Sequence, residues 1–332
     1  MKLFIFALIF LGCARSNNNA AETVITVPEE SLISGPRFVL IPDSVEPGNP
    51  ITIGYADNFE AKGISQRPFH AVLINSVGKR ITKSAFFNLD QEEGEPELKA
   101  AILVIPSTAA AGDATISIES SNGIVHMLPF TIEPREFPAE IIHLNQANTD
   151  LRTKPDPKKT AESELLWKIL SHTGTEIYSG ERGERFVFPV DSSRRTSVYG
   201  GRRVYQYSTG STDTTIHAGI DIGVPTGTEV RACAAGKVVL ARPRIVTGNT
   251  VIVEHLPGFY SLYYHMDKIS VQENAMVEAG FPLGTSGSTG LATGPHLHWE
   301  IRVSTENADP DAFLSRPILD KNDIINRIKE EK

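Results

Sequence analysis

The chain has 332 residues, of which 40% are hydrophobic, and this length is sufficient to build more than one hydrophobic core. It carries 32 Lys and Arg against 40 Asp and Glu, a formal net charge of −8, with no long basic run. Because duplex binding generally needs a basic stripe, this balance argues against a nucleic-acid partner.

The N-terminus begins with Met and Lys and continues with an apolar run over residues 3–11. About 20 apolar residues are needed to span a bilayer, so this run predicts a signal peptide and not a transmembrane helix. The run ends in Leu-Gly-Cys at residues 11–13, which resembles a lipobox whose cysteine receives diacylglycerol. Phe10 departs from that pattern, and cleavage without lipid is therefore the alternative to lipidation of Cys13.

We accordingly predict a signal peptide over residues 1–13 and a flexible tether over residues 14–35, where serine and asparagine occur. The mature protein is then periplasmic or exposed at the cell surface, anchored to a membrane through its N-terminal lipid. Lipidation of Cys13 leaves Cys233 without a disulfide partner, and the apolar run around Cys233 predicts a small buried side chain.

Residues 36–134 consist of short β-rich runs separated by turn residues, with no helical periodicity. The runs are FVLIP, ITIGYA, HAVLINS, AILVIP, ATISIES and VHMLPFTI. Regular short strands with Gly, Pro, Asn and Asp between them predict an immunoglobulin-like (Ig-like) β-sandwich.

Residues 135–185 differ in composition and are predicted to form a connecting arm. Its first part, NQANTDLRTKPDPKK, predicts an extended segment. A short amphipathic helix is expected behind Thr160 as its N-cap, because apolar residues follow at helical spacing. These are Leu165, Leu166, Ile169 and Leu170.

Residues 186–316 are again strand-rich, and residues 317–332 predict a C-terminal helical tail. Within the strand-rich part, Thr250–His255 and Tyr260–His265 are two β-rich runs joined by Leu-Pro-Gly-Phe, a hairpin signal. The fold expected for the whole chain is therefore mainly β, with a short helix in the connecting region.

Two short motifs bring together residues suited to metal chemistry: HAGID, with His217 and Asp221, and HLHWE, with His296 and His298. Strand alternation places both imidazoles of HLHWE on one side. His217 and Asp221 also fall in phase on a strand, although Gly219 is equally compatible with an extended loop. Imidazole and carboxylate suit zinc, and three protein ligands leave a fourth position for water, which is typical of a catalytic site. His217, Asp221 and His298 are the predicted ligands.

Such a site needs a proton acceptor within reach of the water, and the chain has no HExxH run to supply a glutamate. His296 beside the ligands is one candidate. His265 in SLYYHMDKI is the second, because the predicted hairpin carries it on a strand next to the metal.

At this point the chain resembles a known family, the lysostaphin-type (LytM-domain, M23) peptidoglycan endopeptidases. The resemblance covers residues 186–314 through FVFPV, SVYGGRR, HAGIDIGVPTGTEVRACAAGKVV, TVIVEH, SLYYHMDKI and GSTGLATGPHLHWEI. It implies an antiparallel β-sheet domain with one Zn²⁺ held by the HxxxD pair and the second histidine of HxH. It also implies catalytic roles for the first histidine of HxH and for the histidine of the Y-x-H strand, His296 and His265.

The function implied is zinc-dependent hydrolysis of peptide bonds in peptidoglycan stems or cross-links, for cell-wall remodelling. A water on the metal attacks the peptide carbonyl, assisted jointly by the two histidines. The alternative is a non-catalytic wall-binding or amidase-activating module. Many such modules lack one of the five positions, and this chain keeps all five.

Several features stay open at this level. The Ig-like domain is either a spacer or a binding module for the wall or a protein partner, and no protein regulator is identified. The connecting arm either packs beside the catalytic domain or lies across its groove and restrains it. The glycine-rich run over residues 284–294 predicts a tight loop that shapes the groove, because it lacks the GK[ST] ending of a phosphate loop.

Other polar residues are given structural interpretations. The pairs at residues 194–195 and 202–203 are expected to be solvated arginines. His255 is predicted to lie either in the core or beside the site. No chemistry is expected of the four remaining histidines, which are His70, His126, His143 and His172.

Overall fold

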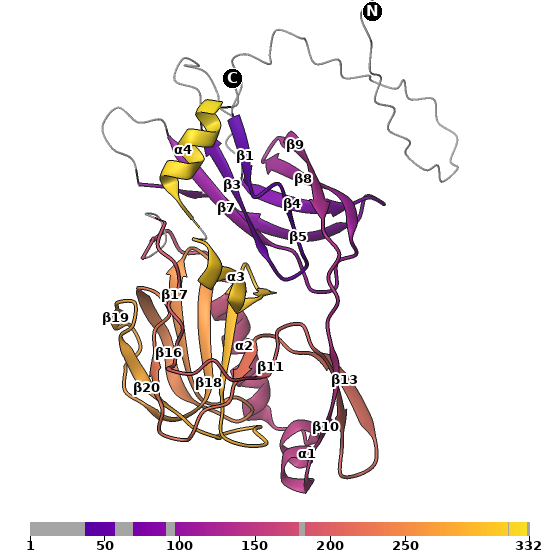
Figure 1. Ribbon diagram of the computed structural model, residues 1–332, viewed down its shortest axis with the longest axis vertical. Helices are drawn as coiled ribbons and strands as arrows, with labels where there is room; N and C mark the ends of the chain where they lie inside the picture. Colours follow the sequence, from indigo (N-terminus) through magenta and orange to yellow (C-terminus); the bar gives the residue numbers. More distant parts are fainter. Residues whose placement is uncertain (1–36, 57–68, 91–96, 179–182, 318, 331–332) are drawn as a thin grey trace, which may run out of the picture. The chain divides into compact units, whose positions relative to one another are not determined.

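The computed structural model describes residues 37–56, 69–90, 97–178, 183–317 and 319–330 (Figure 1). Of the described residues, 47% lie in strands and 14% in helices, which confirms the expected mainly β fold. The predicted signal peptide, Cys13 and the tether lie outside the described residues. Within the described part of the chain, no helix has both the length and the apolar character needed to cross a membrane.

Nine strands in the first part of the described chain form two sheets. They are β1 (Arg37–Ile41), β2 (Ser44–Val45), β3 (Pro50–Ala56), β4 (His70–Asn75), β5 (Arg80–Ala85), β6 (Phe87–Asn88), β7 (Leu98–Val104), β8 (Gly112–Ser120) and β9 (Gly123–Ile132). One sheet has the order β1-β3-β7-β6 and the other β2-β9-β8-β4-β5. The β2–β9 pair is parallel, and the other pairs are antiparallel.

Alternate residues of these strands point into one core between the two sheets. On β3 they are Ile51, Ile53 and Tyr55, each fully buried. The facing sheet contributes Ile116 and Ile118 of β8 to the same cluster. Because strand side chains alternate with period two, the intervening residues of each strand are free to face a second layer.

For β3 and β7 that second layer includes the C-terminal helix. Helix α4 (Lys321–Glu330) buries Ile324 and Ile328, and it contacts β1 and β3 (Figure 1). A Cβ added at Gly54 of β3 would lie 2.6 Å from a methyl group of Ile324, so glycine permits this close approach. The helix expected from the C-terminal isoleucine spacing is thus present.

The connecting region departs from the predicted extended arm with one helix. It contains strand β10 (Ala139–His143) and two helices, α1 (Gln146–Thr153) and α2 (Pro157–Leu170). The N-cap of α2 is Asp156, whose side chain accepts a hydrogen bond from the Lys158 N–H at 2.7 Å. The predicted cap at Thr160 was wrong, because Pro157 suits the first helical position and starts the helix one turn earlier.

Two further sheets follow. Their strands are β11 (Arg195–Ser197), β12 (Arg202–Gln206), β13 (Thr212–Ile216), β14 (Ile220–Ile222), β15 (Glu229–Arg231), β16 (Gly236–Arg244), β17 (Gly248–Leu256), β18 (Phe259–Ile269), β19 (Met276–Val277), β20 (Pro282–Ser286), β21 (Leu297–Val303) and β22 (Glu306–Ala308). The main path of the ten-stranded sheet is β11-β14-β21-β18-β17-β16-β19, and β10-β12-β13 form a three-stranded sheet. A last short helix, α3 (Pro310–Ser315), follows β22.

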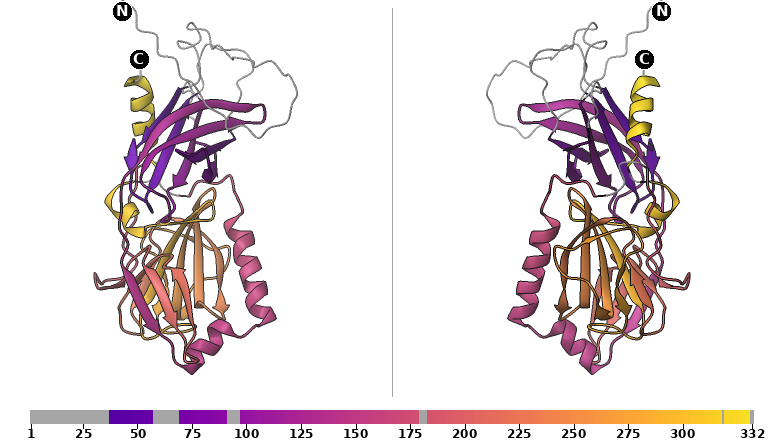
Figure 2. Two further views of the ribbon diagram at one scale, coloured as in Figure 1. Left: turned by 90° about the vertical axis from the view of Figure 1, so that its right-hand side faces the viewer. Right: turned by 90° about the vertical axis from the view of Figure 1, so that its left-hand side faces the viewer.

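Strands β17 and β18 form the predicted hairpin at the centre of the large sheet. Both are buried almost throughout, because both faces of the sheet are covered. One face packs into the larger core through residues such as Val253 and Tyr263. The other carries Ile252 and Leu262 against α2, which Figure 2 shows running along this sheet. The centre of the sheet is therefore a rigid support for side chains at the ends of its strands.

Candidate active site

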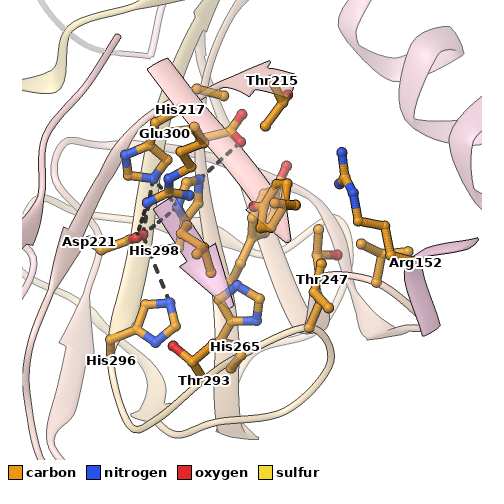
Figure 3. A pocket seen from close by; sticks show the side chains of 18 of the residues that line it. Arg152, Thr215, His217, Asp221, Thr247, His265, Thr293, His296, His298 and Glu300 are labelled. Atoms are coloured by element: carbon orange, nitrogen blue, oxygen red, sulfur yellow. Dashed lines mark hydrogen bonds and ion pairs between the residues drawn. The ribbon is translucent and has the colours of Figure 1, made fainter. Parts of the chain in front are cut away.

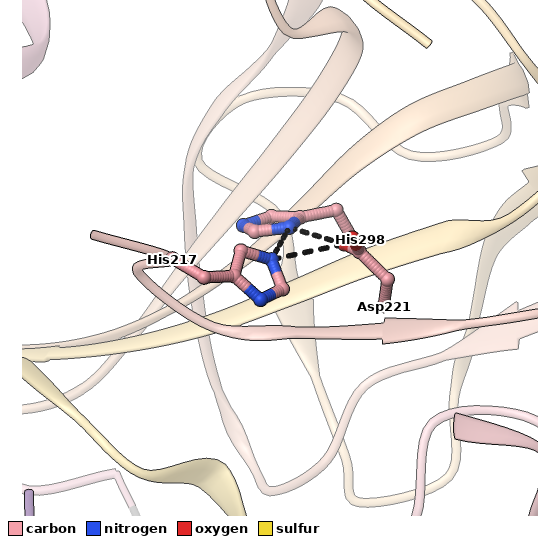
Figure 4. A group of neighbouring side chains, drawn as sticks. All are labelled: His217, Asp221 and His298. Carbon is pink, nitrogen blue, oxygen red and sulfur yellow. Dashed lines mark hydrogen bonds and ion pairs between the residues drawn. The ribbon is translucent and has the colours of Figure 1, made fainter. Parts of the chain in front are cut away.

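Three buried side chains converge on one point where β14, β21 and the loop after β13 meet. His217 Nε2 lies 3.1 Å from Asp221 Oδ1 and 3.0 Å from His298 Nδ1, and His298 Nδ1 lies 2.7 Å from Asp221 Oδ1 (Figure 4). The exposed fractions of the three residues are 2%, 9% and 7% in chain order. The sequence prediction that these three residues form one group is thus matched by their geometry.

Backbone pairing brings the three residues together. Asp221 on β14 is the direct antiparallel partner of His298 on β21. His217 lies in the loop between β13 and β14, so the loop alternative for this residue is the correct one. Gly219 keeps the loop close, because a Cβ there would lie 2.2 Å from the carbonyl oxygen of Trp299. Only glycine therefore permits this approach of the loop to β21.

In His217 and His298, the ring nitrogen that points away from the group forms a hydrogen bond, and this bond fixes the tautomer. Nδ1–H of His217 donates to the Val198 carbonyl at 2.8 Å, which leaves Nε2 with a free lone pair. Nε2–H of His298 donates to Glu300 Oε1 at 3.0 Å, which leaves Nδ1 free toward the group. Metal-binding histidines commonly donate their second N–H in this way. The geometry is that of ligands held in place by their neighbours.

The donor set fits a zinc ion. Two imidazole nitrogens and one carboxylate oxygen are ligands that zinc accepts, and four ligand atoms about 2.1 Å from a tetrahedral zinc lie roughly 3.4 Å apart. The observed separations, 2.7 to 3.1 Å, are slightly shorter. A shift of less than about 1 Å between ligand atoms would admit the ion. His217, Asp221 and His298 are therefore the residues that could hold it.

Charge within the group favours cation binding. Burial opposes ionisation of Asp221, but its contacts with the imidazoles of His217 and His298 hold the pKa of this carboxyl well below its usual range. Burial also lowers the pKa of His217, which favours its neutral form. Burial lowers the pKa of His298 too, but its hydrogen bonds to Asp221 and Glu300 outweigh burial and raise it to about 9. A metal ion would take the place of that proton.

His265 and His296 lie beside this group, as the sequence predicted. Their ring centroids are 4.8 Å apart, and His296 Nε2 is 3.8 Å from Asp221 Oδ1 (Figure 3). Nδ1–H of His265 donates to the Thr289 carbonyl at 2.7 Å, and Nδ1–H of His296 donates to the Gly294 carbonyl at 2.8 Å. Each ring therefore keeps its Nε2 lone pair available.

His265 owes its position to an irregular point in β18. Its φ is +59°, and the pairing of β18 with β17 shifts register between Tyr263 and Met266. Non-glycine residues rarely adopt this left-handed conformation, and such residues cluster at functional sites. Burial and the neighbouring His296 and His298 lower the pKa of His265 to about 3, so its ring is neutral at neutral pH.

The five residues lie on one cavity of about 220 Å³ (Figure 3). The predicted glycine-rich loop supplies one part of its lining, with Leu291, Ala292 and Thr293. The connecting region supplies another, with Ile142, Leu144 and Arg152. The connecting region thus contributes to the site itself, which its composition did not indicate.

Arg203 was interpreted wrongly from the sequence as a solvated surface residue. Its Nη2–H donates to Asp221 Oδ2 at 2.6 Å, and its side chain is only 11% exposed. Asp221 thus uses one oxygen toward the histidines and the other toward Arg203. The doublet Arg202-Arg203 carried no signal that distinguished the inward residue from its neighbour.

His255 belongs to the core and not to the site. Its Nδ1–H donates to the Ala235 carbonyl at 2.8 Å, and its Nε2 accepts from Ser261 at 2.7 Å. Burial lowers the pKa of His255 to about 4. Cys233 packs beside it, fully buried, and burial raises the pKa of its thiol to about 12, as expected for a small core residue without reactivity.

Comparison with known proteins gives one family. Residues 215–310 match the family model described as Peptidase family M23. This segment contains all five site residues. It starts after β10, α1, α2 and Arg203, so several residues that line the cavity lie upstream of the matched segment.

Two curated relatives match over a similar length. The peptidoglycan DD-endopeptidase ShyB of Vibrio cholerae is 35% identical over 124 residues, 37% of this chain and 28% of that protein. The DD-carboxypeptidase/endopeptidase Mpg of Neisseria meningitidis is 38% identical over 109 residues, 32% of this chain and 25% of that protein. The matches thus span about a quarter of the relatives' own length.

A solved structure matches over more of the chain. It is described as a putative peptidase M23 from Pseudomonas aeruginosa, with a TM-score of 0.51 and 25% sequence identity. The match covers 81% of this chain and 94% of that one. It therefore extends well beyond the segment that the family model covers.

Proposed function

We propose that this chain is a zinc endopeptidase that hydrolyses peptide bonds in the stems or cross-links of peptidoglycan. The observation that carries the proposal is the grouping of His217, Asp221 and His298 with two further imidazoles, His265 and His296, on one cavity. Three protein ligands leave a coordination position open, as catalytic zinc sites require. The family match and the printed names of the relatives support peptidoglycan as the substrate.

When bound, zinc would polarise a peptide carbonyl. It would also lower the pKa of a water molecule in its open coordination position. The part played by the chain is proton transfer. His265 has its Nδ1 proton held by Thr289, so its Nε2 can accept a proton on the cavity side. Once protonated, His265 can pass that proton on to the leaving amine nitrogen.

His296 is the second acceptor and shares these roles with His265. Its ring lies next to Asp221 and is fixed by the Gly294 carbonyl. Once protonated, either imidazole donates a hydrogen bond and stabilises the oxyanion of the tetrahedral intermediate. The rigid sheet below and the loop at residues 291–293 keep these groups in place.

The alternative is a non-catalytic module that binds the wall or activates an amidase. The five intact positions favour the enzyme, because a binding module has no need of two polar histidines held beside a metal site. Restraint of the site by the connecting region is also compatible with Ile142, Leu144 and Arg152 on the cavity lining. An open cavity of about 220 Å³ beside them favours a role as part of the groove wall.

Incubation with purified sacculi tests this function. The zinc-loaded protein without residues 1–13 is expected to release soluble muropeptides, and mass analysis of the fragments would identify the bond that is cut. Addition of a chelator should abolish release. Absence of any release by a protein that retains zinc would contradict the enzyme and favour the binding module.

The proposal includes export and a lipid anchor at Cys13, based on the apolar run over residues 3–11 and the Leu-Gly-Cys sequence. Cells fed a labelled fatty acid should incorporate label into the wild-type chain and not into Cys13→Ser. The Cys13→Ser chain should lose its membrane fraction while its zinc content stays unchanged. Equal membrane association of both proteins would contradict lipidation and favour cleavage without lipid.

We further propose that residues 36–134 are an immunoglobulin-like domain that acts as a spacer, followed by the connecting region and a peptidase domain over residues 186–316. The strand order supports this: β1-β3-β7-β6 corresponds to an ABED sheet, and β9-β8-β4 corresponds to GFC. An experimental structure in which β3 and β4 pair in one sheet would contradict the assignment.

A further inference from the structure

We propose that Glu140, which lies in the connecting region upstream of the family match, is a positioning residue of the metal centre. It holds two of the three ligands through Ser197 and Arg203, and it offsets the positive charge of Arg203 beside the metal. The inference rests on the proposed zinc site and extends that site to a segment that neither the motifs nor the family model include.

The first connection runs from Glu140 to His217 through Ser197. The Ser197 hydroxyl donates to Glu140 Oε1 at 2.7 Å, so its oxygen is free to accept a hydrogen bond. His217 Nδ1 lies 3.3 Å from that oxygen and also 2.8 Å from the Val198 carbonyl. Only Nδ1–H satisfies both acceptors. The carboxylate thus helps to fix the tautomer that leaves Nε2 of His217 as the ligand atom.

The second connection runs from Glu140 to Asp221 through Arg203. Arg203 Nε–H donates to Glu140 Oε1 at 2.5 Å, and Arg203 Nη2–H donates to Asp221 Oδ2 at 2.6 Å. The planar guanidinium fixes both carboxylates at once. With Oδ2 occupied in this way, Asp221 presents Oδ1 alone to the two histidines.

Charge gives Glu140 a second task. A guanidinium that contacts a ligand of a divalent cation repels that cation, and a buried site screens the repulsion less than water does. Asp221 supplies one negative charge, which alone cannot neutralise both the metal and Arg203. Glu140 adds a second carboxylate, and hydrogen bonds from Arg203 and Ser197 outweigh its partial burial and keep it ionised.

The position of Glu140 is set by strand pairing. Strand β10 pairs in parallel with β12, and Glu140 is the direct register partner of Arg203. Alternation along β10 directs Ile142 to the same face, where it lines the cavity, whereas Ile141 is 66% exposed on the other face. The face of β10 that carries Glu140 is therefore built toward the metal group.

Metal affinity of a matched pair of variants tests the inference. Glu140→Gln keeps the shape of the side chain but removes the charge, so the hydrogen bonds from Arg203 and Ser197 lose their charged acceptor and weaken. Glu136→Gln changes an exposed carboxylate four residues earlier, for which the described residues show no hydrogen bond, and serves as control. Zinc Kd is measured by competition with a chelating dye, on protein shown by thermal unfolding to be folded without metal. The absorption spectrum of the Co²⁺-loaded protein reports ligand geometry.

Glu140→Gln is expected to bind zinc about 10–100-fold more weakly and to give an altered Co²⁺ spectrum, as loss of an outer partner does. Glu136→Gln should stay within about twofold of wild type, since changes to exposed side chains have small effects.

A Glu140→Gln protein with wild-type zinc Kd and Co²⁺ spectrum would overturn the inference and leave the proposed zinc site intact. Failure of the wild-type protein to bind either ion would instead overturn the proposed function, and the inference with it.

Discussion

His298→Ala is expected to abolish zinc binding and hydrolysis of sacculi together. The substitution removes one of three ligands and leaves Asp221 and Glu300 without their shared hydrogen-bond partner in a buried site. Loss of a hydrogen-bond partner by two buried carboxylates is costly, so the protein should also lose thermal stability. The fall in zinc affinity should exceed the roughly 100-fold upper range for loss of an outer partner.

Zinc content after dialysis and release of muropeptides are the two measurements for His298→Ala. His143→Ala is the matched control, because His143 is an exposed histidine on β10 that does not line the cavity. It should keep both zinc and turnover. Hydrolysis by His298→Ala that persists without bound zinc would show that the reaction does not depend on this group.

That the five site residues lie on one cavity could be predicted from the sequence, because local rules bring them together. Histidines two apart on a strand share a face whatever the rest of the fold does, and HAGID needs only a short turn to place its two ligands together. The hairpin that carries His265 was also predictable, since its turn residues, Pro257 and Gly258, are adjacent in sequence. Each of these features depends on few residues.

The residues that support the site could not be predicted in this way. Glu140 and Arg203 are 63 residues apart in the sequence, and they meet only because β10 pairs with β12. No local pattern specifies that pairing. Helix α1 was missed because its sequence is polar and is followed closely by Pro155 and Pro157. Its stability comes from Asn145 as N-cap and from contacts such as Asn148 to the Ala292 carbonyl.

Short strands were predicted for the part of the chain before the site, but no local pattern specified how they pair into two sheets. Alternating apolar residues identify strands, whereas the order of strands is set by which edges pair at long range. The burial of β7 on both faces illustrates the limit. Its run LKAAILV is buried throughout, because one face joins the core between the sheets and the other joins the core that contains α4.

His265→Asn is expected to keep zinc and lose turnover by about 10²–10⁴-fold, the range for removal of a general acid-base group. The hydrogen bond of His265 goes to the Thr289 carbonyl and not to a ligand atom, so His217, Asp221 and His298 should keep their arrangement. Asparagine suits the test better than alanine. It tolerates the left-handed backbone at φ +59°, and its amide can donate to the Thr289 carbonyl as the ring does.

Comparison of His265→Asn with His296→Asn then separates the two roles on a defined peptide substrate. Both variants should retain wild-type zinc content, and their combination should be scarcely slower than the worse single variant if the histidines act on one proton path. Effects that multiply would instead indicate separate tasks, one histidine activating water and the other stabilising the oxyanion. Wild-type turnover by His265→Asn would exclude this residue from catalysis, and its strained backbone and buried neutral ring would then need a purely structural explanation.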